Sequence, residues 1–585
     1  MGEPSVPATA RRKVLSRREI ESRIGNGQLI IILGTDVLRL DSWIKFHPGG
    51  ELAIKHMVGR DATDEVNALH SAKALHSMKR FRIGSVDKRW VNFVPPVQGG
   101  QFRCYDDAEN ENPGELGSEM ISGELSPSPP SSATSDCIQD GEVSSRHRNS
   151  ASTKSPSQSP SPVLRAESSP EPRFCVLDAR TQQEIILDQA DYPPLHGEHQ
   201  HNITLKYRAL HKRIENEGLY DCNYLAYAVE ALRYSILFAL FILCLRRSWF
   251  GFAGLFLGCF WHQLVFTAHD AGHMGITHDF QADTCIGIIV ADFIGGLSLG
   301  WWKSSHNVHH IMTNSPEHDP DIELMPFFAL SHRFFTSLRS TYYNRVMDYD
   351  AIAKFAVKYQ HYLYYPILLF GRFNLYFLSW DHILTALGRG KSGGGGHGGL
   401  VQWHRWLELA GQIFFWTWFG YGVCYLSIPT WRDRILFILI SHMVTAPLHV
   451  QITLSHYGMS TADLGVHESF AQRMLRTTMD VDCPPWLDFF HGGLQFQAIH
   501  HLYPRIPRHN LRQTQRLVRE FCEDVQIPYA VFSFVDGNKK VLTKLGDIAR
   551  QARILEECRR VCAASQDILA GGHHHHTGHS KAYAT

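Results

Sequence analysis

The sequence predicts a multidomain protein with a small α+β domain, a disordered linker and an all-α integral-membrane domain. Three observations support this fold class. The chain has 585 residues, which is too long for a single hydrophobic core. A stretch rich in serine and proline interrupts it. Apolar runs follow that stretch, and several approach the roughly 20 residues that a helix needs to cross a bilayer.

The overall charge argues against one class of partner. Lys and Arg together number 57, and so do Asp and Glu, so the composition does not indicate a basic surface for nucleic acid. We therefore expect no nucleic-acid partner. The 12 cysteines include no C-x-x-C pair, which predicts free thiols in a reducing compartment rather than disulfides.

The first domain is predicted to cover residues 14–95. It opens with a short helix, continues into the alternating run 29–33, which is typical of a strand, and then contains helical segments broken at His47-Pro-Gly-Gly50. The preceding residues carry charge and proline but no apolar run of the kind found in secretory signals. We expect this domain to stay cytosolic.

Residues 106–171 are predicted to form a disordered linker. Segments such as SPSPPSSATSD and STKSPSQSPSPV contain too few apolar residues to build a core. A tether of this composition lets the first domain move relative to the rest of the chain. A second low-complexity segment, residues 570–585, contains a run of histidines and is expected to be a tail.

The membrane domain is predicted over residues 200–545. Four runs have the composition of spanning helices, namely 225–245, 250–268, 407–426 and 435–454. Two interrupted runs, 286–301 and 362–380, contain charged residues or proline and fit the membrane interface better than its centre. Four crossings leave the histidine clusters described below on one side of the membrane, where we expect a cytosolic cap.

Two histidines of the first domain indicate a haem site. His47 precedes a Pro-Gly-Gly turn, and His70 ends the segment NALHS. Two imidazoles on opposite faces of a haem leave no open position on the iron, which suits electron transfer. His56 and His76 are the alternatives, and we expect both at the surface.

This part of the chain resembles cytochrome b5 over residues 14–90. The resemblance lies in the HPGG turn, in GRDATDEVNALHS and in FRIGSV. It implies that His47 and His70 are the axial ligands of a haem b.

Three further histidine clusters follow in the membrane domain. Each has the spacing that places its rings on one face of a helix. A single cluster is typical of interfacial histidines that bind only water or lipid headgroups. Seven imidazoles together favour a borderline metal such as iron and are too many for one four-coordinate zinc ion. The clusters are His269 and His273, then His306, His309 and His310, and finally His500 and His501, which follow Gln497.

These clusters resemble the histidine boxes of front-end membrane desaturases, which carry a fused N-terminal cytochrome b5 domain and a QxxHH third box. Among them, the fungal sphingolipid Δ8-desaturases are the most similar group. The likeness lies in HDAGHMGITHDF, GLSLGWWKSSHNVHHIMTNSPEHDPDIE, SHYGMSTADLG and DFFHGGLQFQAIHHLYPRIPRHNL.

The resemblance implies that the seven box histidines hold two iron ions and that His456 is an additional ligand. Gln497 stands where many desaturases have histidine, and it could contact metal, water or a neighbouring ligand. Asp270 and His491 are expected to orient imidazoles.

The resemblance also implies an activity and its setting. We expect an enzyme that uses O2 and electrons from NADH-cytochrome b5 reductase, passed through the fused haem, to introduce a C8–C9 double bond into the long-chain base of ceramide. We expect it in the endoplasmic reticulum membrane, with both metal sites facing the cytosol.

Three alternatives remain open from the sequence. A front-end acyl desaturase of the Δ5 or Δ6 type differs only in its substrate pocket. A b5-fused lipid hydroxylase also uses clustered histidines, although the Gln497 box favours desaturation. A membrane-anchored b5 electron donor, or a haem-binding receptor, would need no working boxes, and the presence of all seven histidines argues against both.

Overall fold

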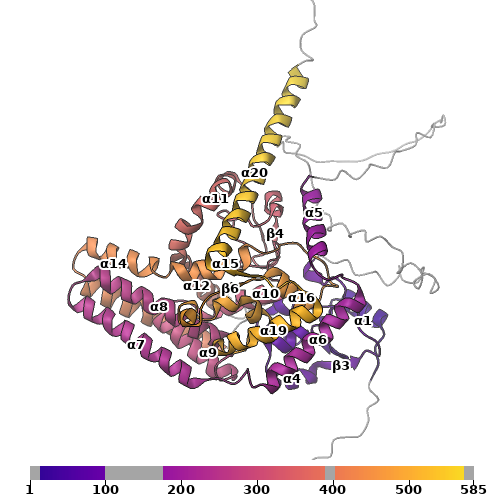
Figure 1. Ribbon diagram of the computed structural model, residues 1–585, viewed down its shortest axis with the longest axis horizontal. Coiled ribbons are helices and arrows are strands. Elements are labelled where there is room, and N and C mark those ends of the chain that lie inside the picture. The colour runs from indigo at the N-terminus through magenta and orange to yellow at the C-terminus, as the bar shows by residue number, and fades with distance from the viewer. Residues whose placement is uncertain (1–12, 99–175, 389–401, 572–585) are drawn as a thin grey trace, which may run out of the picture.

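A computed structural model describes residues 13–98, 176–388 and 402–571 (Figure 1). The predicted linker at residues 106–171 and residues 572–585 of the predicted tail lie outside the described residues, while residues 570 and 571 of that tail end the last helix.

The N-terminal unit (residues 13–98) is the α+β domain that the sequence predicts. Its antiparallel sheet has the strand order β1-β2-β3, and β1 confirms the expected strand. The strands are β1 Ile30–Leu33, β2 Asp36–Arg39 and β3 Arg82–Ser85. The helices are α1 Arg17–Gly25, η1 Ile44–Phe46, α2 Glu51–Lys55, α3 Thr63–Leu69, α4 Ala72–Met78, η2 Lys79–Phe81 and η3 Pro96–Gln98.

A helical hairpin forms the first two candidate membrane spans, α7 Tyr224–Arg246 and α8 Phe250–Gly272. They match the runs expected at 225–245 and 250–268. The side chain of Asn223 caps α7 by accepting a hydrogen bond from the amide of Ala226. Only 17% of the apolar window of α7 is buried, so most of this helix is free to face lipid.

The third candidate span is Trp431–Tyr457, made of α14 Trp431–Met443 and α15 Ala446–Tyr457. It covers the run expected at 435–454. Glycines let α8 approach α14 closely, since a Cβ at Gly254 would lie 2.9 Å from the carbonyl oxygen of Phe437. Backbone approach through small residues is typical of helices that pack within membranes.

A bent pair of helices could serve as a fourth span. The first arm is α9 Phe280–Ile288 with η5 Ile289–Ile294, and the second is α10 Leu299–Ile311, at 118° to the first. By length and composition the described residues therefore contain three spans, or four if this pair is one. The pair includes most of the run 286–301 that was expected at the interface.

The run expected as a span at 407–426 is helical but is not among these candidates. It forms α13 Gln402–Phe415 and the π-helical η7 Trp416–Ser427. Its buried face carries polar side chains that hold the bend of the preceding pair. Glu408 accepts hydrogen bonds from the Gly300 amide and the Ser298 hydroxyl, and Gln412 donates one to Asp292. The apolar composition of this run did not predict these hydrogen bonds, because they join residues far apart in the chain.

The remaining elements surround this framework. They are α5 Val176–Asp191, η6 His332–Thr336, α11 Ala351–Leu369, α12 Gly371–Gly388, α17 Asp488–His491, η8 Pro485–Leu487, η9 Leu494–Phe496, η10 Arg508–Asn510 and the two-stranded sheet of β4 Arg339–Ser340 and β5 Arg345–Val346.

A helical cap lies against the C-terminal ends of α8 and α15. Tyr207, Met474, Leu502 and Phe521, each from a different helix, belong to its buried core. We use "the cap" for α6 Gly197–Asn216, α16 Phe470–Thr477, α18 Gln497–Leu502, α19 Leu511–Val525, α20 Phe534–Gly571 and the parallel pair β6 Asp480–Asp482 and β7 Val531–Ser533.

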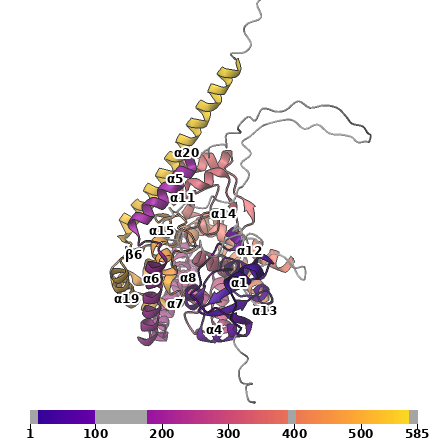
Figure 2. The same ribbon diagram turned by 90° about the vertical axis from the view of Figure 1, so that its right-hand side faces the viewer.

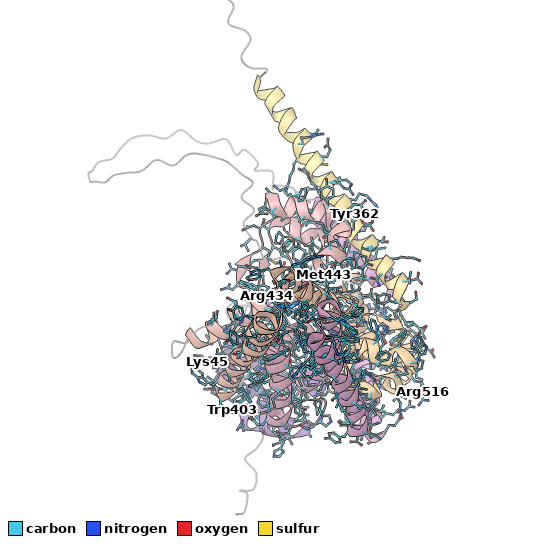
Figure 3. All side chains as sticks on the ribbon, turned by 90° about the vertical axis from the view of Figure 1, so that its left-hand side faces the viewer. Lys45, Tyr362, Trp403, Arg434, Met443 and Arg516 are labelled. Carbon is cyan, nitrogen blue, oxygen red and sulfur yellow. The ribbon has the colours of Figure 1, made fainter. Side chains whose placement is uncertain are left out.

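The views place these parts relative to one another. Figure 1 shows α7, α8 and α14 extending to one side, with the N-terminal unit in indigo on the other. Figure 2 shows that unit below the projecting α20. Figure 3 looks from the side of the hairpin and labels Arg434 on α14 and Arg516 on α19 of the cap.

Candidate haem and iron sites

The N-terminal unit holds His47 and His70 with their rings facing each other. The ring centroids lie 5.9 Å apart, with 30° between the planes. His47 follows η1, and Gly50 takes a left-handed φ of 85° to start α2, which only glycine does readily. His70 ends α3.

Backbone carbonyls set the tautomers of both rings. Nδ1 of His47 lies 2.8 Å from the oxygen of Gly50, and Nδ1 of His70 lies 3.0 Å from that of Val66. Because a carbonyl only accepts, each Nδ1 carries the hydrogen and each Nε2 keeps a free lone pair. The pair therefore fits the two axial positions of a haem.

His56 corrects one expectation from the sequence. Its side chain is fully buried, and its ring makes an edge contact with His318 of the membrane domain at 5.0 Å. It is not a surface residue, because the N-terminal unit packs against the rest of the protein at this point. His76 is exposed, as expected.

The three histidine boxes converge from separate elements. His269 and His273 lie at the end of α8, and α10 and α18 carry the other two boxes. His456, at the end of α15, joins them. Two of the eight rings, those of His269 and His306, are half-buried, and the other six are buried.

The boxes form two neighbouring groups of ligand atoms. The first contains His269, His273, His306 and His500, and the second contains His309, His456 and His501. Within each group the possible ligand atoms all lie within 4.8 Å of one another.

His310 lies between the two groups. Its ring centroid is 4.8 Å from that of His500 and 4.3 Å from that of His501. Its Nε2 lies 3.1 Å from Nε2 of His306. The eight histidines thus form one continuous cluster.

Two carboxylates that the sequence analysis did not single out hold the second box. Asp319 is fully buried, and its oxygens accept from Nδ1 of His309 at 2.9 and 3.0 Å. Asp321 lies 3.6 Å from Nδ1 of His306 and 3.8 Å from that of His309. Both acids lie in the segment EHDPDIE just after the second box. This cluster of carboxylates near the box was the signal from which the sequence could have identified them.

The surroundings shift the pKa values of the two acids in opposite directions. Burial raises the pKa of Asp319. Burial also opposes ionisation of Asp321, but His309 and His306 outweigh it and hold the pKa of Asp321 below its usual range.

Thr313 and Asn314 tie the second box to the other two ligand segments. The Thr313 hydroxyl donates to the carbonyl of His309 at 2.7 Å, so its oxygen accepts from Nδ1 of His501 at 3.2 Å. Asn314, at a left-handed φ of 58°, donates from its amide to the carbonyl of His456 at 2.9 Å.

These tautomers make the cluster suitable for metal. With Nδ1 of both His309 and His501 held by other groups, their Nε2 atoms face each other at 3.2 Å. Adjacent ligands of one metal ion lie at about this separation when each nitrogen–metal bond is about 2 Å. Nε2 of His273 and of His500 is also buried without a hydrogen-bond partner among the described residues.

The third box remains uncharged at neutral pH. Burial lowers the pKa of both His500 and His501 well below the ordinary value, and neighbouring histidines add to this effect. Neutral imidazole is the form that binds a metal ion.

The other expected site residues have mixed outcomes. Asp270 lies 3.9 Å from Nδ1 of His269 and bonds Arg508 and Tyr227. His491 instead makes ring contacts with Phe490 and Phe534. Its orienting role therefore stays a prediction.

Gln497 is buried at the start of α18. Its side-chain oxygen has no hydrogen-bond partner among the described residues. Contact with a metal ion therefore stays a prediction.

Comparison with known families agrees with this architecture. Residues 16–87 match the model of the cytochrome b5-like haem/steroid binding domain, and residues 247–533 match that of the fatty acid desaturases. The chain belongs to the membrane fatty acid desaturases that carry a fused cytochrome b5-like domain. It is therefore an oxidoreductase of lipid metabolism, and its families bind haem and iron.

Individual relatives extend the match to nearly the whole chain. A Delta 8-(E)-sphingolipid desaturase of Emericella nidulans is 61% identical over 96% of this chain and 98% of its own length. One of the same description from Kluyveromyces lactis is 48% identical over 94% and 95%. A Delta(8)-fatty-acid desaturase of Helianthus annuus is 38% identical over 52% of this chain and 63% of its own.

Proposed function

We propose that this protein is a sphingolipid Δ8-desaturase that introduces an E double bond between C8 and C9 of the long-chain base of ceramide. The observation that carries the proposal is the convergence of eight histidines beside a unit with two facing imidazoles. The full-length likeness to Delta 8-(E)-sphingolipid desaturases supports the substrate and the double-bond geometry.

The proposed cofactors are haem b and two iron ions, with O2 as co-substrate. His47 and His70 would hold the haem. One iron would bind among His269, His273, His306 and His500, the other among His309, His456 and His501, with His310 between them. When bound, the haem relays single electrons, and the iron pair uses them to activate O2 for removal of hydrogen from unactivated carbon.

The residues of the chain supply position and environment. Asp319 and Thr313 fix the tautomers of His309 and His501 so that Nε2 of each ring faces the metal position. Burial of six of the eight rings restricts access of water to the reacting centre. The choice of C8 and C9 rests on holding the lipid chain at a fixed distance from its polar end.

The electron donor and the location complete the proposal. NADH-cytochrome b5 reductase would reduce the haem, and the linker at residues 106–171 would let the N-terminal unit reach both the reductase and the cap. The protein would lie in the endoplasmic reticulum membrane with both metal sites facing the cytosol.

Lipid analysis tests this function. The intact chain is expressed in a yeast that lacks sphingolipid unsaturation, and double bonds are located by derivatisation and mass spectrometry. We expect an 8,9-unsaturated long-chain base that disappears in His500→Ala and decreases in His47→Ala. His76→Ala is the matched control, because this exposed histidine lies in the same unit as His47.

Other products would point to other functions. Unsaturated acyl chains would favour the acyl-desaturase alternative, for which the partial likeness to the Helianthus annuus protein is the specific support. A hydroxylated lipid would favour a hydroxylase. Unchanged lipids from a well-expressed, haem-loaded protein would favour an electron donor.

A further inference from the structure

The N-terminal unit does not stand apart from the cap but shares buried cores with the membrane domain and the cap. Ile311 and Met312, at the end of α10, belong to the same apolar cluster as Ile54 and Met57 of the N-terminal unit. Ala68 of α3 belongs in turn to the core of the cap. The contact therefore excludes water over part of its area.

Charged contacts surround this apolar contact, and the ones at the α3 edge of the N-terminal unit all have the same polarity. Arg208 of α6 lies 2.6 Å from Asp64 and 3.4 Å from Asp61. Arg473 of α16 lies 3.3 Å from Glu65. The cap supplies the cations and the α3 edge of the N-terminal unit supplies the anions, an arrangement that specifies orientation as well as attraction.

A third arginine, Arg505 in the segment between α18 and η10, contacts the backbone of a proposed haem ligand. Nη1 of Arg505 donates to the backbone carbonyl of His70 at 2.8 Å. The guanidinium also lies 5.6 Å from the ring of Tyr220, which restricts its orientation. Arg505 follows His501 of the third box by four residues.

The other proposed haem ligand lies near the second box. A Cβ added at Gly49, two residues after His47, would lie 3.4 Å from the side-chain nitrogen of Asn307. Asn307 directly follows His306. Both facing imidazoles of the N-terminal unit are thus next to segments that carry box histidines.

We propose that Arg208, Arg473 and Arg505 form a docking clamp for the α3 edge of the N-terminal unit. The clamp holds the unit where His47 and His70 adjoin the second and third boxes, which is the position for electron delivery. This inference rests on the proposed function.

Intramolecular attachment makes such a clamp effective. Because the linker keeps the unit near the cap, the charge pairs need only modest strength to populate the docked position. Arg208 is one-third exposed, so salt weakens its pairs, whereas the pair of Arg473 and Glu65 is largely buried and less sensitive to salt.

A zero-length cross-link measures docking without using activity. Nζ of Lys73 lies 3.7 Å from Asp279 at the edge of the same contact, and both side chains are accessible. In membranes containing the intact chain, a carbodiimide should activate the Asp279 carboxylate as an O-acylisourea. The Lys73 amine then attacks it, which forms an amide bond and releases a urea, and peptide mass spectrometry should detect the linked peptides.

Charge reversal then tests the clamp. Arg208→Glu with Arg473→Glu should lower the Lys73–Asp279 cross-link at least about tenfold, because each change places like charges together. Adding Asp64→Lys and Glu65→Lys should restore it. Arg516→Glu makes the same charge change at an exposed position of α19 and is the matched control.

Electron delivery needs a second readout. In the reversed variant the haem spectrum and reduction of the haem by NADH and reductase should match wild type, whereas stopped-flow reoxidation in the presence of lipid and O2 should be about tenfold slower. Arg505→Met should slow reoxidation without removing the haem, and Arg505→Lys should restore part of the rate, as expected of a positioning residue.

The outcomes separate the clamp from the enzyme activity. A cross-link that is absent from wild type, or unchanged by charge reversal, overturns the clamp. A lost cross-link with wild-type reoxidation overturns its role in electron delivery. If wild type makes no unsaturated lipid, the proposed function fails, but the cross-link still decides whether the clamp exists.

Discussion

The two metal-binding regions of this protein hold their histidines in different ways. In the N-terminal unit, His47 and His70 each bond a backbone carbonyl three or four residues away. In the membrane domain, His309 bonds the carboxylate of Asp319 and His501 contacts Thr313, a residue of another element.

The difference has a chemical consequence. A neutral carbonyl orients an imidazole, whereas a carboxylate also increases its donor strength toward a metal ion. A haem that only passes electrons needs orientation. An iron pair that activates O2 benefits from stronger donors. The haem site, which is held by nearby backbone, should therefore tolerate distant mutations better than the histidine-box cluster.

The largest expected effect comes from removing a box ligand. His501→Ala should abolish desaturation and lower the iron content, because this ring belongs to the second ligand group and faces His309. Iron per protein is measured by elemental analysis after deletion of the histidine-rich tail, with the exposed His199→Ala as control. Full iron content in the variant would contradict the assignment.

Removing a haem ligand should separate the two regions. His47→Ala should abolish the visible haem band, since only one axial imidazole remains, while iron content stays at the wild-type level. Absorbance and elemental analysis on one sample measure both quantities. Loss of both metals together would show that the sites are not independent.

A change of one carboxylate should weaken only the histidine-box cluster. Asp319→Asn should reduce iron affinity or desaturation about 10- to 100-fold, the usual cost of losing a partner that orients a metal ligand. The haem spectrum should not change. Asp348→Asn alters an exposed carboxylate of the same domain and serves as control; equal activity of both variants would exclude the role of Asp319.

A smaller effect should appear in stability. Asp480 accepts a hydrogen bond from the amide of Ala498 at 2.8 Å, next to the third box, and burial raises its pKa to about 6. A carboxyl with a raised pKa favours folding in its protonated form. Its contribution is complete below pH 4 and is lost as the pH rises to about 6.

The pH dependence of unfolding measures this contribution. From pH 4 to 6, wild type should lose about 2 kcal/mol relative to Asp480→Asn, because one pKa unit corresponds to about 1.4 kcal/mol and the rest of the contribution is lost outside this range. Thermal unfolding in detergent across this range gives the difference. Asp482→Asn, exposed on the same strand, should follow wild type. Parallel curves for wild type and Asp480→Asn would contradict the assignment.

The sequence alone determined whatever depends on local spacing. The β1 strand, the α7–α8 hairpin and the helical placement of the boxes follow from side-chain periodicity and apolar length, which are fixed by residues close in the chain. The likeness of HPGG and of the boxes to known motifs is local for the same reason.

Only the tertiary structure decided what depends on contacts between distant segments. The bend held by Glu408 and Gln412, the burial of His56 against His318, and the bond of Thr313 to His501 each join segments far apart in the chain. Side-chain periodicity does not encode such contacts, because spacing along the chain does not say which residue of another segment a polar side chain will meet. Packing supplies that partner, and with it the chemical setting of the site.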